Sequence, residues 1–226
     1  MRKAVALVLV CLVGAGFYVV LAEIPFGADK MDVAKHYTRH GADETGAANI
    51  VTSVVLTYRG FDTLGEVTVL FIAALGVGAV LAGTARAAGG GATEASLIVR
   101  TGSRLLFPLI ILLGAYIFLH GHLTPGGGFQ GGAVIASGFL LLYLAGPGHR
   151  VARKTFSAAE SLSGLAFLAV GLLGLVWGAG FLSNYLPLGT RHALLSAGVM
   201  PILYVAIGLK VGAELAGVVG HLMERP

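Results

Sequence analysis

The chain has 226 residues, of which 56% are hydrophobic and only 12% charged, and its mean hydropathy is +0.87. Soluble proteins carry about twice that charged share, so this chain has too few charges to cover a surface that faces water. The composition excludes a soluble globular protein and indicates an integral membrane protein with the lipid bilayer as its solvent. The single cysteine, Cys11, excludes an intrachain disulfide or a cysteine metal cluster.

Six stretches without Asp, Glu, Lys or Arg approach the length that a helix needs to cross a hydrocarbon layer of about 30 Å. We therefore predict an all-α, polytopic membrane protein with about six transmembrane helices. The first stretch follows Arg2 and Lys3, but it is longer than the apolar region of a signal peptide, so we expect a retained helix. In chain order the stretches are 4–22, 67–85, 105–119, 131–145, 162–182 and 193–209.

Lysine and arginine are retained on the cytoplasmic side of membrane proteins, so their distribution predicts orientation. Alternate sides of the predicted helices hold ten and five of the 15 such residues. Both termini belong to the richer side and are predicted to be cytoplasmic, which an even number of helices also requires. The modest net charge of +4 is divided in this way and forms no patch for a nucleic acid. The ten are Arg2, Lys3, Arg86, Arg100, Arg104, Arg150, Arg153, Lys154, Lys210 and Arg225.

The connections between these helices differ in character. Residues 29–44 are charged and are predicted to form a solvated loop. Apolar residues recur at spacings of three and four over 50–58, which indicates an amphipathic helix at the outer interface or docked on a neighbour. The sequence AAGGGA at 87–92 is typical of a flexible linker. We therefore expect a two-helix region at 1–86, a linker at 87–96 and a four-helix region at 97–226.

The most unusual local sequence is HGHLTPGGGFQGG at residues 120–132, on the predicted outer face. One interpretation is an ordinary hairpin between two helices. The other is a loop whose exposed amides and carbonyls lie beside an ion or water path, because irregular backbone at membrane depth must be enclosed by protein or a water-filled cavity. In that case Phe129 would be a packing plug and Gln130 a polar contact. The candidate residues are Pro125, Gly126, Gly127, Gly128, Phe129 and Gln130.

Two acidic residues follow a helix-capping pattern. Thr63 precedes Glu66 by three residues, with Asp62 beside it, so Glu66 is predicted either to cap the second membrane helix or to act as an intramembrane carboxylate that carries ions. Ser157 precedes Glu160 in the same way, ahead of the fifth helix. For Glu160 we expect capping alone.

The last helix carries a stripe of small residues and, nearly opposite on the helical wheel, the charged pair Lys210 and Glu214. If the helix remains in the bilayer beyond residue 209, it must be enclosed by other helices on both sides. Alternatively it has already left the membrane, so that Lys210 reaches solvent and pairs there with Glu214. The stripe consists of Gly208, Gly212, Ala216 and Gly220.

No pattern of catalytic or cofactor-binding residues stands out. Ser137 precedes Gly138 but lacks the Gly-x-Ser-Gly of intramembrane serine proteases and an activating histidine–aspartate pair. His120 and His122 are two residues apart with no carboxylate nearby, so we expect ordinary interfacial histidines and no metal site. We predict no enzymatic activity, no cofactor and no metal.

Three segments resemble the B subunit of Mrp-type multisubunit sodium/proton antiporters: residues 121–134 with the glycine motif, the lead-in FPLI at 107–110, and IGLKVGAEL at 207–215. The earlier segment NIVTSVVLTYRGFDTLGE at 49–66 is similar to the carboxy-terminal end of the large A subunit. In membrane-bound hydrogenases and sulfane-sulfur reductases that region can be a separate small subunit. The chain thus resembles a fusion of two neighbouring pieces.

The resemblance implies a non-catalytic, multi-pass subunit of a cell-membrane complex. Large antiporter-like subunits would hold the main proton channels, and this chain would help to form a sodium path and contact small membrane subunits, with Na+ and H+ as the transported ions. It also implies roles for Glu66, Lys210, Glu214 and the glycine motif at the ion path or at subunit contacts. Two alternatives remain open, namely the sodium-translocating arm of a redox complex such as a membrane-bound hydrogenase, and a purely structural scaffold.

Overall fold

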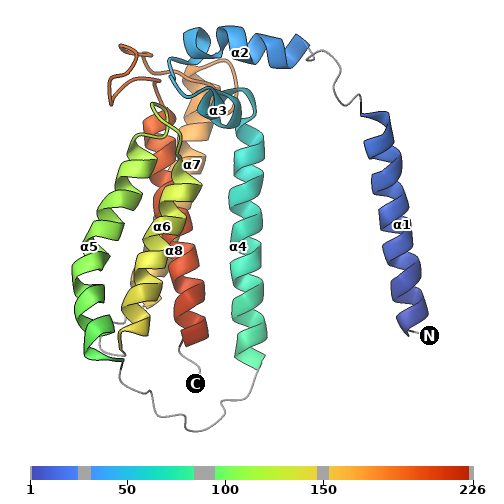
Figure 1. Ribbon diagram of the computed structural model, residues 1–226. Coiled ribbons are helices and arrows are strands. Elements are labelled where there is room, and N and C mark those ends of the chain that lie inside the picture. The colour runs from blue at the N-terminus through green and yellow to red at the C-terminus, as the bar shows by residue number, and fades with distance from the viewer. Residues whose placement is uncertain (1, 25–31, 84–94, 147–152, 224–226) are drawn as a thin grey trace. The chain divides into compact units, whose positions relative to one another are not determined.

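The computed structural model describes residues 2–24, 32–83, 95–146 and 153–223, and every regular element in these ranges is a helix (Figure 1). This confirms the all-α prediction. The linker predicted at 87–92 lies outside the described residues. In chain order the elements are α1 (Arg2–Glu23), α2 (Asp32–Thr45), α3 (Ile50–Thr52), the π-helix η1 (Ser53–Tyr58), α4 (Gly60–Gly83), α5 (Leu97–Leu119), α6 (Gly128–Leu144), α7 (Arg153–Trp177) and α8 (Met200–Met223).

Among the described residues, five helices, α1, α4, α5, α7 and α8, are long and apolar enough to cross a membrane. The sixth, α6, has 17 residues, which corresponds to about 25 Å and is shorter than the hydrocarbon layer. The glycine-rich connection before α6 is therefore expected to lie close to the membrane boundary. This set of helices is consistent with the polytopic protein predicted from the sequence.

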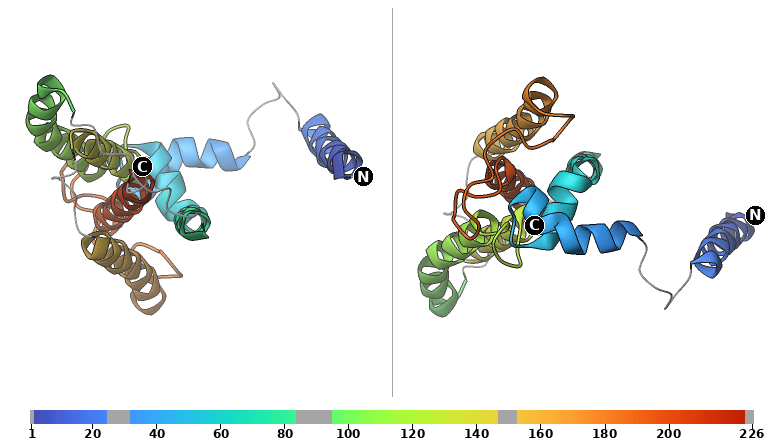
Figure 2. Two further views of the ribbon diagram at one scale, coloured as in Figure 1. Left: turned by 90° about the horizontal axis from the view of Figure 1, so that it is seen from below. Right: turned by 90° about the horizontal axis from the view of Figure 1, so that it is seen from above.

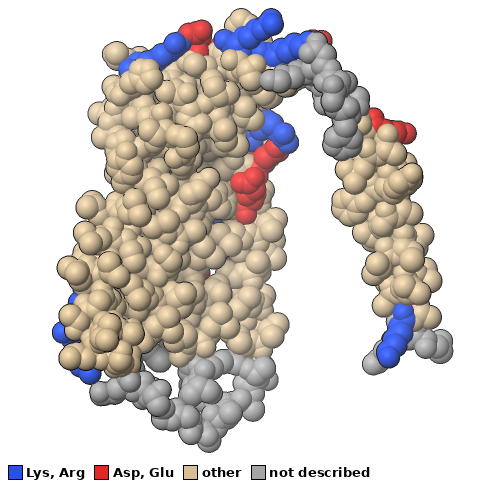
Figure 3. Space-filling model, viewed as in Figure 1, with Lys and Arg blue, Asp and Glu red and all other residues tan. Residues whose placement is uncertain are grey.

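The described residues form two compact units, one ending at His36 and one beginning at Tyr37. In the second unit α8 lies in the centre, with α4, α7 and the α5–α6 pair around it, as the end-on views show (Figure 2). Within the chain, 61% of the most apolar stretch of α8 is buried, against 17% for α5 and 6% for α4. The outer helices therefore turn most of their apolar surface away from the chain, toward lipid or other subunits. Charged side chains lie mainly near the two ends of this bundle (Figure 3).

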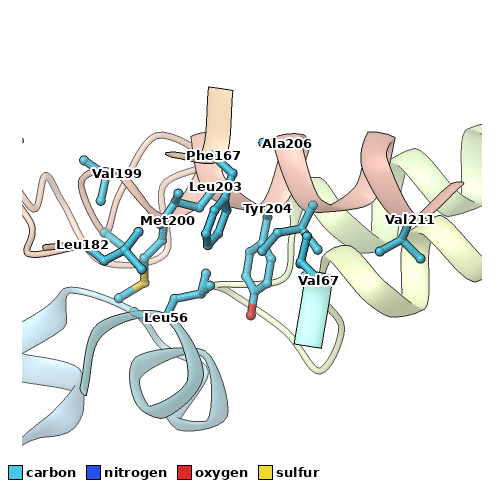
Figure 4. Close-up of a cluster of buried hydrophobic side chains, with 13 residues drawn as sticks. Leu56, Val67, Phe167, Leu182, Val199, Met200, Leu203, Tyr204, Ala206 and Val211 are labelled. Atoms are coloured by element: carbon cyan, nitrogen blue, oxygen red, sulfur yellow. The ribbon is translucent and has the colours of Figure 1, made fainter. Parts of the chain in front are cut away.

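The core of the second unit joins the front and back parts of the sequence. Leu56 of η1 and Val67 of α4 are buried together with Phe167 of α7 and with Leu203 and Tyr204 of α8 (Figure 4). The front residues from Tyr37 onward thus pack into the same body as the four later helices. A boundary near residues 87–96 remains a description of the sequence, because the compact units do not divide there.

Close approach between α6 and α8 requires glycine on both helices. A Cβ atom at Gly128 would lie 2.5 Å from the Ile207 side chain, and one at Gly208 would lie 2.4 Å from the Phe118 ring of α5. A Cβ at Gly132 would lie 2.8 Å from Val211 Cβ and 2.9 Å from the backbone of α8. These distances confirm that the small-residue stripe of the last helix is a packing face.

The outer connections differ from the sequence predictions. Residues 32–45 form the helix α2, so the predicted solvated loop is wrong there. Its polar residues have partners in the fold: Thr45 hydrogen-bonds Ser53 at 2.7 Å, Tyr58 donates to Glu44, and Asp43 forms an ion pair with Arg191. The amphipathic helix predicted at 50–58 is confirmed as helical, although most of it is a π-helix.

The segment between α7 and α8 was predicted as parts of two membrane helices, but residues 178–199 are irregular. Asn184 explains how an apolar loop avoids unpaired backbone groups. Its Oδ1 accepts hydrogen bonds from the amides of Leu186 and Val199, both at 3.2 Å, and its amide donates to the carbonyl of Ala197 at 3.4 Å. Apolar composition alone does not distinguish such a side-chain-stabilised loop from a helix.

Gly132→Ala tests the close packing of α6 on α8. The added methyl group meets the backbone of α8, which a side-chain rotation cannot relieve, so we expect a destabilisation of about 1–3 kcal/mol. The measurement is the thermal unfolding midpoint of the purified protein in mild detergent. Gly102→Ala on α5 is the matched control, because its Cβ would meet nothing within 4 Å. Equal midpoints for the two variants would contradict the packing account.

Candidate functional site

The glycine-rich connection between α5 and α6 is held by the segment that precedes the π-helix. The Asn49 side-chain amide donates to the carbonyls of Gly121 at 2.8 Å and Thr124 at 3.0 Å, and its backbone N–H donates to the carbonyl of His122 at 3.1 Å. Three carbonyls of the connection are therefore satisfied by one residue 70 or more positions earlier. Asn49 also caps α3 through a bond from the amide of Val51 at 3.1 Å.

A buried hydroxyl pair extends this attachment to α8. The hydroxyl of Thr52 lies 2.7 Å from the carbonyl of Gly121 and 2.7 Å from the Tyr204 hydroxyl. Figure 4 shows Tyr204 extending from α8 toward the η1 segment. Since three separate parts of the chain meet here, the connection is fixed in the fold and is more than a simple hairpin. Sequence reasoning identified neither Asn49 nor Thr52 as contributors, because no local pattern links them to residues so far along the chain.

The predicted residues of the connection occupy different environments. Phe129 packs against the buried core, as expected for a plug, whereas Pro125 and Gln130 are exposed. Gly127 has a φ of +155°, a conformation that favours glycine, and a Cβ there would lie 2.9 Å from Gln130 Oε1. A Cβ at Gly126 would lie 2.9 Å from the carbonyl of Ile117. The glycines are thus required by backbone conformation and close approach, and only Pro125 and Gln130 are available to a partner.

His122 is fully buried in this connection, and neither ring nitrogen has a hydrogen-bond partner among the described residues. Burial lowers the pKa of His122, the charge of His120 lowers it further, and the nearby backbone of Ala193 and Leu194 opposes part of the shift. His120 itself is half-exposed, stacked on Tyr116 with ring centroids 4.2 Å apart. The two histidines therefore have distinct surroundings, and no group of three or more metal-ligating residues exists in the described ranges.

The capping prediction for Glu66 is wrong. Helix α4 begins at Gly60, so Glu66 lies in its second turn, and the Thr63 hydroxyl donates to the carbonyl of Val55 at 2.6 Å instead of capping. Asp62 forms an ion pair with Arg59 at 2.5 Å. Glu66 is exposed on the surface of α4. A carboxylate there must face water, headgroups or another subunit.

Lys210 and Glu214 are enclosed inside the bundle. Lys210 Nζ lies 3.5 Å from Glu214 Oε2 and 4.9 Å from the centre of the Phe71 ring of α4. Only 8% of Lys210 and 2% of Glu214 are exposed. The two-sided enclosure inferred from the small-residue stripe is thus confirmed, and counting Lys210 among the cytoplasmic side's positive residues was wrong.

A third charged side chain joins this pair from α7. Glu160 Oε1 lies 3.9 Å from Lys210 Nζ, and α7 begins at Arg153, so Glu160 lies in its second turn and does not cap the helix as predicted. The Lys210 stem packs against Gly164, where a Cβ would lie 3.6 Å from Lys210 Cδ. The capping pattern at residues 157–160 obscured this contact. A glycine one turn after an acid on the same helix face was the available signal.

Two pockets open along the groove between α4 and α7, above the central helix α8. One has a volume of about 290 Å³ and is lined by Leu64, Thr68 and Phe71 of α4 together with Glu160 and Lys210. The other has about 350 Å³ and is lined by Phe71, Glu160 and Glu214, as well as by Ser157, Ser161 and His221. Glu160 and Phe71 belong to both pockets. The charged cluster is therefore accessible from the groove on either side of Phe71.

Comparison with known proteins accounts for both halves of the chain. The profile of a family described as a domain related to the MnhB subunit of Na+/H+ antiporters matches residues 98–217. The chain belongs to this family. A second profile, that of the E-type subunit of MBH, matches residues 1–93. This MnhB-family chain is therefore an MnhB domain preceded by a region that occurs elsewhere as a subunit.

Relatives of known name belong to membrane complexes. A probable A/B-type K+/H+ antiporter subunit of Rhizobium meliloti is 32% identical over 165 residues, which are 62% of this chain and 16% of that protein. A putative antiporter subunit mnhB2 of Staphylococcus aureus is 29% identical over 133 residues, covering 54% of this chain and 94% of the subunit. An uncharacterized protein of Methanocaldococcus jannaschii is 32% identical over 200 residues, or 74% of each chain.

Two solved complexes contain chains with this fold. A chain of the archaeal membrane-bound sulfane sulfur reductase matches over 98% of both chains with 45% identity and a TM-score of 0.77. A chain of the Mrp complex from Dietzia sp. DQ12-45-1b matches 98% of this chain and 26% of its own length, with 27% identity and a TM-score of 0.74. The MnhB-family chain is a multi-pass integral protein of the cell membrane.

His122 predicts a pH dependence of stability. Since the pKa of His122 is lowered in the fold, its contribution to stability is complete above the unfolded value of about 6.5 and is lost as pH falls through the lower folded value. We expect the unfolding midpoint to fall between pH 7.5 and pH 5, and this fall to be smaller in His122→Gln. Replacing the half-exposed His120 by Gln is the control. An unchanged pH slope in His122→Gln would exclude this role for the buried ring.

Proposed function

We propose that this chain is a non-catalytic membrane subunit of a multisubunit monovalent cation/proton antiport complex, with Na+ as the cation. The observation that carries the proposal is the MnhB domain with a buried charged cluster in its membrane bundle, beside pockets that reach it. In a membrane interior, charged side chains are costly and are typical of ion pathways. The cluster is a feature that a scaffold role alone does not require.

Partner subunits are implied by the surface of the bundle. Large apolar side chains such as Leu112 of α5, Phe61 of α4 and Val176 of α7 are about two-thirds exposed or more. Lipid covers part of such a surface, and the antiporter and Mrp relatives are subunits of larger assemblies. We infer that large antiporter-like subunits and small membrane subunits cover the rest, and that both termini are cytoplasmic.

Exposed polar residues near the outer end would meet these partners. Glu66 on α4 and the Pro125 and Gln130 side chains are available at the surface, while Phe129 holds the connection against the core. We assign Glu66 and Asp62 to the ion path or a subunit contact on α4. A Glu66→Gln variant with normal assembly and normal exchange would remove Glu66 from this role.

A second function is favoured by a specific observation. The 45% identity over nearly the whole of both chains is to a chain of the sulfane sulfur reductase, a respiratory complex, and exceeds the 27% identity to the Mrp chain. In this alternative the chain belongs to the ion-translocating arm of a redox complex. The role of the chain itself is the same in both cases, since neither gives it a catalytic site.

Purification from native membranes in mild detergent tests the proposal. We expect the chain to elute with large antiporter-like subunits, and vesicles that contain the complex to move protons in response to an imposed Na+ gradient. Vesicles with the same complex lacking this chain are the control and should lose that response. Recovery of the chain as a solitary monomer would contradict the proposal. Co-elution with redox subunits, and proton or sodium movement that requires an electron donor, would select the alternative.

A further inference from the structure

The buried cluster of Glu160, Lys210 and Glu214 contains an unequal number of opposite charges. Two carboxylates face one ammonium, so the three side chains sum to −1 when all are ionised. The exposed fractions of the side chains are 23% for Glu160, 10% for Lys210 and 1% for Glu214. An uncompensated charge in such surroundings costs several kcal/mol. The cluster therefore requires one further positive charge, and a proton or a cation can supply it.

Glu214 has unused capacity to bind that charge. Both of its oxygens are buried, and neither has a hydrogen-bond partner among the described residues. Its ion pair with Lys210 is 3.5 Å long, outside the range of about 2.7–3.2 Å for a hydrogen bond. A carboxylate can accept at about four lone-pair positions. The buried carboxylate thus lines the 350 Å³ pocket with its oxygens available.

The same pocket supplies other oxygen ligands. The hydroxyls of Ser157 and Ser161 and the carboxylate of Glu160 line it from α7, opposite Glu214 of α8. Oxygen atoms are the ligands that hard cations prefer. The ionisable groups that face this space are Glu160 of α7 and Lys210 and His221 of α8, with Tyr143 of α6 near Gly220, whereas the residues contributed by α4 are Phe71, Ala74 and Leu75.

The order of residues along α4 places the two pockets one after the other. The smaller pocket is lined from Leu64 to Phe71 and the larger from Phe71 to Leu75, a total of about 16 Å of helix. Lys210 lies over the Phe71 ring where the pockets meet. A fixed positive charge at this junction repels a free cation, so the junction hinders passage of a cation that has not first been exchanged at the carboxylates.

We propose that Glu160, Glu214 and Lys210 form a binding site for one exchangeable monovalent cation, for which one proton competes. Because the cluster lacks one positive charge, cation and proton exclude each other, and this is the minimal requirement for one-for-one exchange. Lys210 is a tethered counter-ion that keeps the deficit at a single charge. The site rests on the proposed transport function, and it assigns to Glu160 a role that residues 157–160 did not indicate.

Charge arithmetic in the assembled complex tests this site, with Na+ as the probe and Na+-driven proton movement in vesicles at several pH values as the measurement. Glu214→Gln and Glu160→Gln each bring the cluster to zero, so each should raise the apparent KM for Na+ about tenfold or more and remove the competition between Na+ and H+. The double variant Lys210→Gln with Glu214→Gln returns the sum to −1 and should recover part of the Na+ affinity and the competition. Glu23→Gln, on α1, is the carboxylate control and should behave as the wild type.

The outcomes separate the site from the wider proposal. Wild-type complex without Na+-driven proton movement would contradict the proposed function. Wild-type exchange with unchanged Na+ dependence in both single variants would overturn the site alone. A double variant worse than Glu214→Gln would assign the three residues to packing and overturn the site as well. Assembly is checked by size-exclusion chromatography, and Glu160→Gln, the more exposed position, carries the test where Glu214→Gln does not assemble.

Discussion

The close approach of α6 and α8 is the constraint on which the rest of the structure depends. Gly132 and Gly208 allow the two helices to pack at distances where a single methyl group would meet the neighbouring backbone or ring. Packing of this kind is a main source of helix association in membranes, where no hydrophobic difference separates lipid from a helix surface. Because one side of α8 is committed to α5 and α6, its other side faces α4 and α7. That arrangement encloses Lys210 and Glu214.

Enclosure of α8 links packing to function. A lysine on a surface helix would extend to headgroups and pair weakly, whereas Lys210 is held between two carboxylates, an aromatic ring and the space left by Gly164. The cluster then has fixed composition and a fixed deficit of charge. At the outer end, Asn49 and Thr52 hold the glycine-rich connection through its carbonyls, which makes the region before α4 an integral part of the MnhB bundle. The fusion of the two regions in one chain keeps these contacts together.

The sequence predicted the helical class and the two opposed faces of α8, because a four-residue repeat of small side chains and a charged pair on one wheel are local patterns. It did not predict Glu160 as a partner of Lys210, since the pattern Ser157-x-x-Glu160 had a sufficient local explanation. The loop between α7 and α8 was mistaken for helix because its backbone bonds are satisfied by Asn184, a contact that depends on the tertiary structure. Helix α2 was missed because its stabilising contacts, such as Tyr58 with Glu44, join residues far apart in sequence.

An infrared difference spectrum of the assembled complex, recorded on adding Na+ at acidic pH, tests most directly whether a proton and a cation share one negative charge. The account predicts that Na+ converts one protonated carboxylic acid to carboxylate and releases a proton, and that this signal is lost in Glu214→Gln and retained in Glu23→Gln. A Na+-induced spectrum that is identical in the wild type and in Glu214→Gln would contradict it.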